Sequence, residues 1–161
     1  VSVPKENLLG EEGKALNTVS EVIDLATLAI SAEAVGIMQK MNELTLDYTK
    51  TREQFGQALS KFQALQHRMV DTFMVHEQTK SLLLMAAAKM NDKAADTSKS
   101  ISALKYQIGS AAKLIGEESI QLHGGMGVTE EMSIGHYFKR LTTIRTIFGN
   151  SDYHLKRYSS L

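Results

Sequence analysis

This chain of 161 residues contains no cysteine and no tryptophan, and its single proline is Pro4. The lack of cysteine excludes a disulfide framework and a thiolate metal site. The five histidines are scattered without a metal-ligand spacing such as His-Glu-x-x-His, so we predict no metal. Proline removes a backbone donor and disrupts helix interiors. Its absence after Pro4 therefore permits long, unbroken helices.

An excess of charge of either sign is also missing, because 18 basic residues balance 18 acidic residues. Nucleic-acid and membrane-surface binding usually need a basic patch, so we expect no nucleic acid and no membrane among the partners. The longest apolar run, Leu82 to Ala88, is much shorter than the roughly 20 residues that span a bilayer. Since no signal segment opens the chain, we expect a cytoplasmic protein. The length of 161 residues fits one main domain.

Apolar residues recur every three or four positions from about Thr18, which predicts a helix that ends near Thr51. The expected stripe consists of Val19, Val22, Ile23, Ala26, Ile30, Ile37, Met41, Leu44 and Tyr48. A stripe of this kind on one side of a helix indicates burial against other helices.

Two further segments show the same periodicity. The first follows Phe55-Gly56 and ends at the polar patch Asn91-Asp92-Lys93; the second opens near Ser98. The apolar face of the second consists of Ile101, Leu104, Ile108, Ala112, Ile115, Ser119 and Leu122, at a spacing typical of bundle helices. Long helices with short connections predict an all-α protein, an up-and-down four-helix bundle.

The two ends of the chain differ from this pattern. Val1 to Gly10 alternates apolar and polar residues as a strand does, so we assign residues 1–13 to the end of a preceding β-domain or linker. Residues 14–161 are expected to form the helical bundle of a larger protein. A short extra helix is predicted from Glu130 to Lys139, and a last helix ends at Tyr158 after the turn residues 149–152.

The stretch from Gln121 to Glu130 interrupts the helical pattern with Gly124, Gly125 and Gly127. Glycine adopts positive φ and lets another backbone or a phosphate approach closely. A helix C-cap with a tight loop and a contact to an anion or cofactor both explain the pattern, and the glycines alone do not decide between them.

Four blocks, in this order and spacing, resemble the C-terminal region of the flavin-dependent acyl-CoA dehydrogenases. They are Val3-Pro4-Lys5-Glu6-Asn7-Leu8-Leu9, Arg52-x-x-Phe55-Gly56 with Gln63, Gln121-x-x-Gly124-Gly125-x-Gly127, and Ile147-Phe148-Gly149-Asn150-Ser151. The resemblance implies an N-terminal helical domain, a middle β-domain and this bundle, assembled as a dimer or tetramer. It also implies desaturation of an acyl-CoA between Cα and Cβ, with FAD as hydride acceptor and an electron-transfer flavoprotein or similar acceptor.

The resemblance places FAD contacts, to the cofactor of a neighbouring subunit, at particular residues of this chain. They are Arg52, Phe55, Gln63, Gln121, Gly124, Gly125 and Asn150. A guanidinium pairs well with pyrophosphate oxygens, and glycine N–H groups can approach the same anion. Structural alternatives stay open: Arg52 could bind helix carbonyls or a surface carboxylate, Phe55 could belong to a core, and Gln63 could be solvated.

The departures from the family concern catalysis. Phe148 occupies the position of the usual catalytic glutamate, and Ala26 occupies the alternative position on the first helix, so neither supplies a base. Thr27 replaces an arginine near the acyl chain, while Asp24 is retained where the family binds the CoA pantetheine. Glu33 lies seven residues after Ala26, about 10 Å along the helix, and is a weak substitute because a general base must reach the proton.

Three hypotheses follow. The intact protein is a base-lacking subunit of a heteromer whose Glu-bearing paralogue completes the site, or a homo-oligomeric flavoenzyme with an unusual base or acyl-CoA substrate, or a purely structural helical assembly module. In all three cases the 161-residue chain alone is expected to be inactive, because the domains that hold the flavin ring and most of the acyl-CoA site lie elsewhere.

Overall fold

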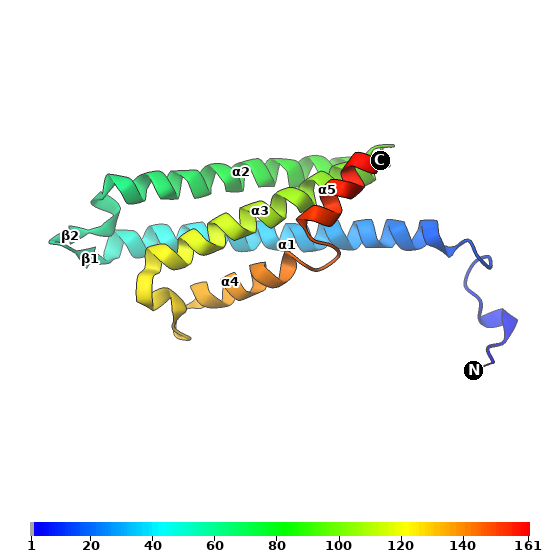
Figure 1. Cartoon of the computed structure of the whole chain (residues 1–161), viewed down its shortest axis with the longest axis horizontal. Helices are drawn as coiled ribbons and strands as arrows, with labels where there is room; N and C mark the ends of the chain where they lie inside the picture. The colour runs from blue at the N-terminus through cyan, green and yellow to red at the C-terminus, as the bar shows by residue number, and fades with distance from the viewer. Residues whose placement is uncertain (1) are drawn as a thin grey trace.

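The computed structural model describes residues 2–161, and it confirms the all-α up-and-down bundle (Figure 1). The α-helices are α1 (Ala15–Thr51), α2 (Gln63–Asn91), α3 (Thr97–His123), α4 (Ser133–Ile144) and α5 (Ser151–Ser160). Helix α3 packs against all four others, and α4 also packs against α1. The short helices α4 and α5 together cover the side of α3 that a single fourth helix covers in a simple bundle.

Helix α3 has the buried face that its sequence predicts. All seven residues of the expected face are buried, and the central isoleucines, Ile101, Ile108 and Ile115, are inaccessible to solvent. A stripe of this width on the helix that contacts every other helix forms the centre of the core.

Helix α1 departs from the predicted stripe. Val19, Val22 and Ile23 are exposed, with Val22 at 59%, and the first turns of α1 extend past the bundle (Figure 1). The line of fully buried side chains is instead partly polar: Asp24, Thr27, Ser31, Ala34, Val35, Met38, Met41, Thr45 and Thr49. Thr27 and Ser31 donate to the carbonyls four residues earlier, both at 2.7 Å. Because these hydroxyls are satisfied within the helix, they are buried without an unpaired donor.

Other corrections concern the ends of elements. Val1 to Gly10 has a strand-like alternation, but between Ser2 and Gly10 the only regular element is the 3₁₀ turn η1 (Lys5–Asn7); Val1 lies outside the described residues. The assignment of residues 1–13 to the end of a preceding β-domain or linker stays a prediction. The helix predicted from Glu130 to Lys139 instead runs from Ser133 to Ile144. Residues 129–132 form turns and bends between η3 (Gly124–Val128), which packs on the end of α3, and the start of α4.

A short hairpin joins α1 to α2. Strands β1 (Glu53–Gln54) and β2 (Gln57–Ala58) pair antiparallel across Phe55 and Gly56, followed by the 3₁₀ turn η2 (Leu59–Lys61). Phe55 and Gly56 have φ of 54° and 79°, which is the backbone of a two-residue type I′ turn. The hairpin fixes the direction of the chain just after Arg52.

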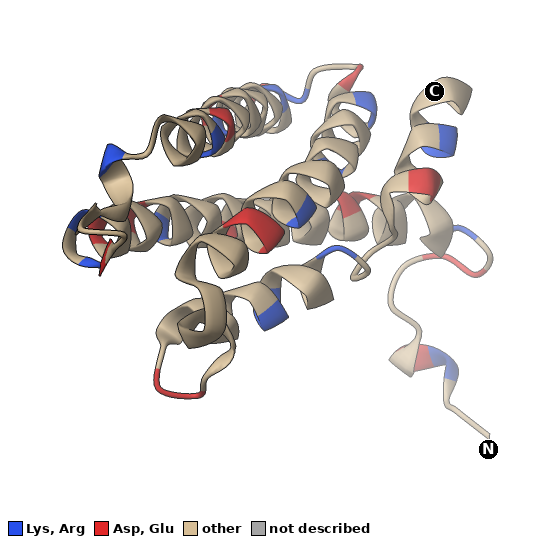
Figure 2. Cartoon of the chain, turned by 60° about the vertical axis from the view of Figure 1, so that its left-hand side comes forward, with Lys and Arg blue, Asp and Glu red and all other residues tan. Residues whose placement is uncertain are grey.

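In the view of Figure 2, basic and acidic residues are interspersed along the helices. Within residues 2–161, no helix has the length and apolar character that crossing a bilayer requires.

Candidate functional site

A cleft of about 520 Å³ lies at the hairpin end of the bundle, where the end of α1 meets the end of α3. We call it the glycine cleft. It is lined by Tyr48, Arg52, Gln54, Leu59, Leu65, Arg68, Gln121, Leu122, His123, Gly124, Gly125 and Met126. Arg52 and the glycine turn, about 70 residues apart in sequence, therefore share one concave surface, as the sequence predicts.

The absence of a side chain has a different structural consequence at each of the three glycines of the turn. The turn is the 3₁₀ helix η3 (Gly124–Val128), in which Gly124 has φ 59° and ψ −141°, a region that side chains other than glycine rarely enter. A Cβ on Gly125 would meet no atom within 4 Å, so its backbone is open. A Cβ on Gly127 would lie 2.8 Å from the Ile120 carbonyl oxygen. Gly127 thus permits packing, whereas Gly125 leaves backbone accessible beside the cleft.

Two arginines contribute positive charge to the cleft. The Arg52 backbone caps α1, where its N–H donates to the Tyr48 carbonyl at 2.8 Å, and within residues 2–161 its side chain pairs with no carboxylate. Arg68 on α2 donates from Nε to Glu118 Oε2 at 2.5 Å, which leaves its other donors available. Sequence reasoning missed Arg68, because a single half-buried arginine on a helix has no motif.

His123, directly before the glycines, is held as a neutral imidazole. Its ring stacks on Tyr48 at 4.3 Å, and its Nδ1 donates to the Ser119 carbonyl at 2.8 Å. Burial lowers the pKa of His123, so Nε2 of the neutral ring is an acceptor. Within residues 2–161 this nitrogen is buried and accepts no hydrogen bond.

Three predicted FAD contacts, Phe55, Gln63 and Asn150, lie outside the cleft lining. Phe55 is at the tip of the hairpin, 91% exposed, with its ring edge against Phe62 at 6.2 Å. Gln63 is exposed at the first position of α2. Neither Phe55 nor Gln63 belongs to the core, and neither lines the cleft within one copy of the chain.

The segment that joins α4 to α5 contains Phe148 and Asn150, away from the glycine cleft (Figure 1). Phe148 has φ 57° and is 42% exposed. The Asn150 side chain caps α5 by accepting a hydrogen bond from the Tyr153 N–H at 2.9 Å. The cap uses Oδ1 of Asn150, and within residues 2–161 the side-chain NH₂ donates to no other group.

Asp24 forms an internal ion pair. It is 4% exposed and accepts two hydrogen bonds from Arg157, at 2.7 and 2.9 Å, and one from the Ser98 hydroxyl at 2.6 Å. This network joins α1 to α3 and α5. A CoA contact at Asp24 remains a prediction from the resemblance, and it would have to share a carboxylate that is already bonded within the chain.

Glu33 is also paired. Arg140 on α4 donates to both of its oxygens, at 2.5 and 2.8 Å, and these bonds lower the pKa of the Glu33 carboxyl. A lowered pKa makes a carboxylate a weaker base. Ala26 and Thr27 have no carboxylate, and that of Asp24 is bonded to Arg157, so these positions provide no free base.

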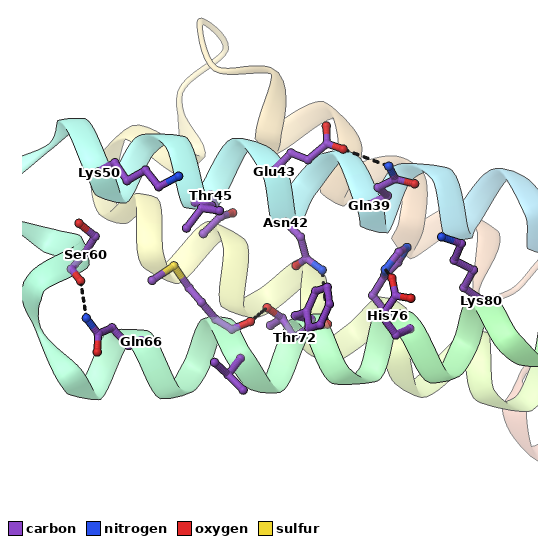
Figure 3. Close-up of a pocket in the computed structure, with 15 residues that line it drawn as sticks. Gln39, Asn42, Glu43, Thr45, Lys50, Ser60, Gln66, Thr72, His76 and Lys80 are labelled. Atoms are coloured by element: carbon purple, nitrogen blue, oxygen red, sulfur yellow. Dashed lines mark hydrogen bonds and ion pairs between the residues drawn. The ribbon is translucent and has the colours of Figure 1, made fainter.

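A second cavity, of about 690 Å³, lies between α1 and α2 (Figure 3). We call it the interhelix groove. Asn42 bridges it by donating to the Thr72 carbonyl at 3.4 Å. Its lining contains neither arginine nor glycine, and it combines apolar Leu46, Val70 and Phe73 with charges of both signs. The interhelix groove is the larger cavity, but the donors suited to a phosphate are in the glycine cleft.

Fold and cleft together define the class: an all-helical domain with an arginine- and glycine-lined cleft at one end of a bundle. Residues 14–159 match the family model described as acyl-CoA dehydrogenase, C-terminal domain. The chain belongs to the acyl-CoA dehydrogenase family, and its fold is that of the family's C-terminal helical domain.

Individual relatives agree with this assignment. The mitochondrial short-chain specific acyl-CoA dehydrogenase of Rattus norvegicus is 33% identical over 144 residues, which cover 88% of this chain and 35% of that protein. The structure of butyryl-CoA dehydrogenase from Megasphaera elsdenii is similar with a TM-score of 0.92 at 28% identity, over 98% of this chain and 41% of that one. A structure from work on the electron transferring flavoprotein of Acidaminococcus fermentans and flavin-based electron bifurcation has the same TM-score and coverage, at 30% identity. The chain spans about a third of the length of the rat relative.

Proposed function

We propose that the chain is the FAD-contacting and oligomerisation domain of a larger acyl-CoA dehydrogenase. The observation that carries the proposal is the shared concave surface of Arg52 and the Gly124–Gly125 turn. FAD is the cofactor that the family match and the flavin-related structural relative indicate.

The residues of the glycine cleft fit a dinucleotide. Arg52 and Arg68 supply donors for pyrophosphate oxygens, and the open backbone at Gly125 allows a phosphate to approach. FAD, when bound, would take the β-hydrogen of the acyl-CoA as hydride. The cleft, including Gln121, would contact FAD that lies mainly on a neighbouring subunit, and Phe55 and Gln63 would complete that contact from outside the cleft lining.

The interhelix groove supports the proposed self-association. Its exposed apolar residues, Leu46, Val70 and Phe73, lie among Lys50, Lys80, Glu43 and Glu77. A mixed-charge rim around an apolar floor can pair with a second copy in which lysines face glutamates. Exposed apolar surface of this kind is typical of an interface.

The catalytic base is the part of the reaction that this chain does not supply. Phe148 cannot accept a proton, Ala26 has no carboxylate, and Glu33 is paired with Arg140. A second candidate function therefore has a specific observation in its favour: the protein is the base-lacking subunit of a heteromer, and a Glu-bearing paralogue supplies the base. A purely structural module is the third possibility.

One experiment separates the three. The intact protein is purified from its own host, and its flavin spectrum and subunit composition are measured. A flavin-containing homomer that oxidises an acyl-CoA and passes electrons to an electron-transfer flavoprotein supports a complete enzyme. A flavin-containing complex with a second, Glu-bearing chain supports the heteromer. A colourless protein that binds neither FAD nor acyl-CoA contradicts both and leaves the structural module.

A further inference from the structure

Lys105 on α3 is a buried cation without an anionic partner. It is 1% exposed, and within residues 2–161 its ammonium is near no carboxylate. Instead its Nζ donates to three carbonyl oxygens: Gly149 at 2.9 Å, Ile144 at 3.0 Å and Arg145 at 3.5 Å. A lysine buried in this way is costly unless all its donors are used, and here its three donors match three acceptors.

These carbonyls belong to one segment, residues 144–150, between the end of α4 and the start of α5. The last carbonyls of a helix have no partner within the helix. Lys105 Nζ donates to the carbonyl oxygens of Ile144 and Arg145 at the end of α4. The same ammonium group donates to the carbonyl oxygen of Gly149, five residues after the helix end. A single side chain thus determines both ends of the connecting segment.

Two other contacts restrain the same segment. His154 Nε2 donates to the Phe148 carbonyl at 2.9 Å. Gly109, one turn after Lys105 on α3, allows Ser151 to approach, because a Cβ there would lie 1.9 Å from the Ser151 hydroxyl oxygen. With these restraints, Phe148 and Gly149 both adopt left-handed backbone, with φ of 57° and 104°. A phenylalanine in this region costs of order 1 kcal/mol, so neighbouring contacts must hold it there.

We propose that Lys105 is a positioning residue, which holds the 144–150 segment so that the side chain at position 148 is presented outward from a fixed, left-handed backbone. The proposal rests on the proposed function, in which position 148 is where the family carries its base. In this proposal, Lys105 keeps position 148 fixed although a phenylalanine stands there.

The 161-residue chain offers a direct test, because it contains no tryptophan. In the variant Phe148→Trp, the single indole reports the mobility of position 148 by time-resolved fluorescence anisotropy. Lys105→Met is then added, since methionine fills a similar volume without a donor. The matched control is Lys113→Met, at an exposed lysine of the same helix.

We expect the amplitude of nanosecond depolarisation to rise roughly twofold in Lys105→Met and to stay unchanged in Lys113→Met. Circular dichroism verifies that each variant keeps its helices. Equal depolarisation in folded Lys105→Met and in the parent would overturn the proposal. The test needs no flavin, so the positioning role of Lys105 can be disproved while the FAD assignment stands. The FAD assignment can likewise be disproved without changing the result of this test.

A second measurement needs no substitution of Lys105. Burial lowers the pKa of Lys105 to about 8, and a neutral amine donates two hydrogen bonds instead of three. The other groups near this segment are His154, whose pKa burial lowers, and beyond it Arg157, whose pKa the Asp24 carboxylate raises. His154 is therefore already neutral at pH 7, and Arg157 stays charged at pH 9.

With those neighbours constant, Lys105 is the group that changes charge between pH 7 and 9. Depolarisation of the indole in the Phe148→Trp variant should therefore increase with a midpoint near pH 8. A flat profile would contradict the positioning role even if Lys105→Met did not fold.

Discussion

Arg157 donates to both carboxylate oxygens of Asp24, at 2.7 and 2.9 Å, across 133 residues of sequence. Arg157 comes from the last helix and Asp24 from the first, and Ser98 and Ser102 of α3 complete the network. The hydrogen bonds to Asp24 raise the pKa of Arg157, so its guanidinium stays charged. The contact stabilises the bundle by joining the first helix of the chain, α1, to the last, α5.

Removal of Arg157 should therefore destabilise the chain strongly. In Arg157→Met the Asp24 carboxylate stays buried with one hydroxyl partner, and we expect a loss of about 3–5 kcal/mol in the free energy of unfolding. Urea denaturation at pH 7 measures it. The control is Arg140→Met, which breaks the exposed Glu33 pair and should cost less than about 1 kcal/mol. Equal losses in the two variants would show that Asp24 is not dependent on Arg157.

The glycine turn predicts two different outcomes for two adjacent substitutions. Gly124→Ala places a side chain at φ 59° and should cost about 1–3 kcal/mol of stability. Gly125→Ala meets no atom within 4 Å and should change stability by less than about 0.5 kcal/mol. In the intact protein, Gly125→Ala should nevertheless weaken FAD binding, because its methyl group covers open backbone beside the cleft. Thermal unfolding and an FAD titration check the two effects separately, and an unaltered FAD affinity would remove Gly125 from the proposed contact.

Lys105 makes global stability depend on pH in a defined direction. Its pKa falls from 10.5 in the unfolded chain to about 8 in the folded chain. Between these values the unfolded chain binds more protons, so the free energy of unfolding rises with pH. Since one pKa unit is worth about 1.4 kcal/mol, the gain from pH 8 to pH 10.5 is at most about 3 kcal/mol.

The difference between the parent and Lys105→Met isolates this contribution. We expect the stability of the parent to increase relative to Lys105→Met over that range, when both are measured by chemical denaturation at several pH values. Parallel curves for the two proteins would mean that Lys105 keeps an ordinary pKa in the folded chain.

Position 148 allows a gain-of-function prediction for the intact protein. If the supporting segment is retained, Phe148→Glu restores a carboxylate at the family position, and a positioned base contributes about 100-fold or more. Phe148→Gln, which has the same size without the base, is the control. Flavin reduction by an acyl-CoA should be faster in the glutamate variant only. Equal rates in both variants would indicate that the segment does not present position 148 to the substrate.

The sequence predicted the parts of the fold that depend on apolar periodicity. All seven residues predicted for the face of α3, from Ile101 to Leu122, are buried, and six of them are apolar. The polar residues that α3 also buries, such as Ser102 and Lys105, were not predicted. The face of α1 was shifted, since Thr27 and Ser31 satisfy their hydroxyls on their own helix and are buried like apolar residues. Polar burial of this kind leaves no periodic apolar signal.

Only those residues of the glycine cleft that belong to a sequence motif were predicted. Glycines and an arginine in a motif are visible in a sequence, and Arg52, Gln121, Gly124 and Gly125 do line one cleft. Arg68 and the stacked pair of Tyr48 and His123 were missed, because only the fold brings their helices together. Lys105 was missed because its three partners are backbone carbonyls, which have no sequence signature.

The most direct measurement is the FAD affinity of the intact protein when Arg52 is replaced. Charge-assisted hydrogen bonds to a pyrophosphate are worth about 1.5–3 kcal/mol, so Arg52→Gln should raise the Kd for FAD by about tenfold or more. Lys113→Gln, which removes one positive charge outside the cleft lining, should leave the Kd unchanged. If the two variants bind FAD with the same affinity as the parent, the glycine cleft is not the FAD contact.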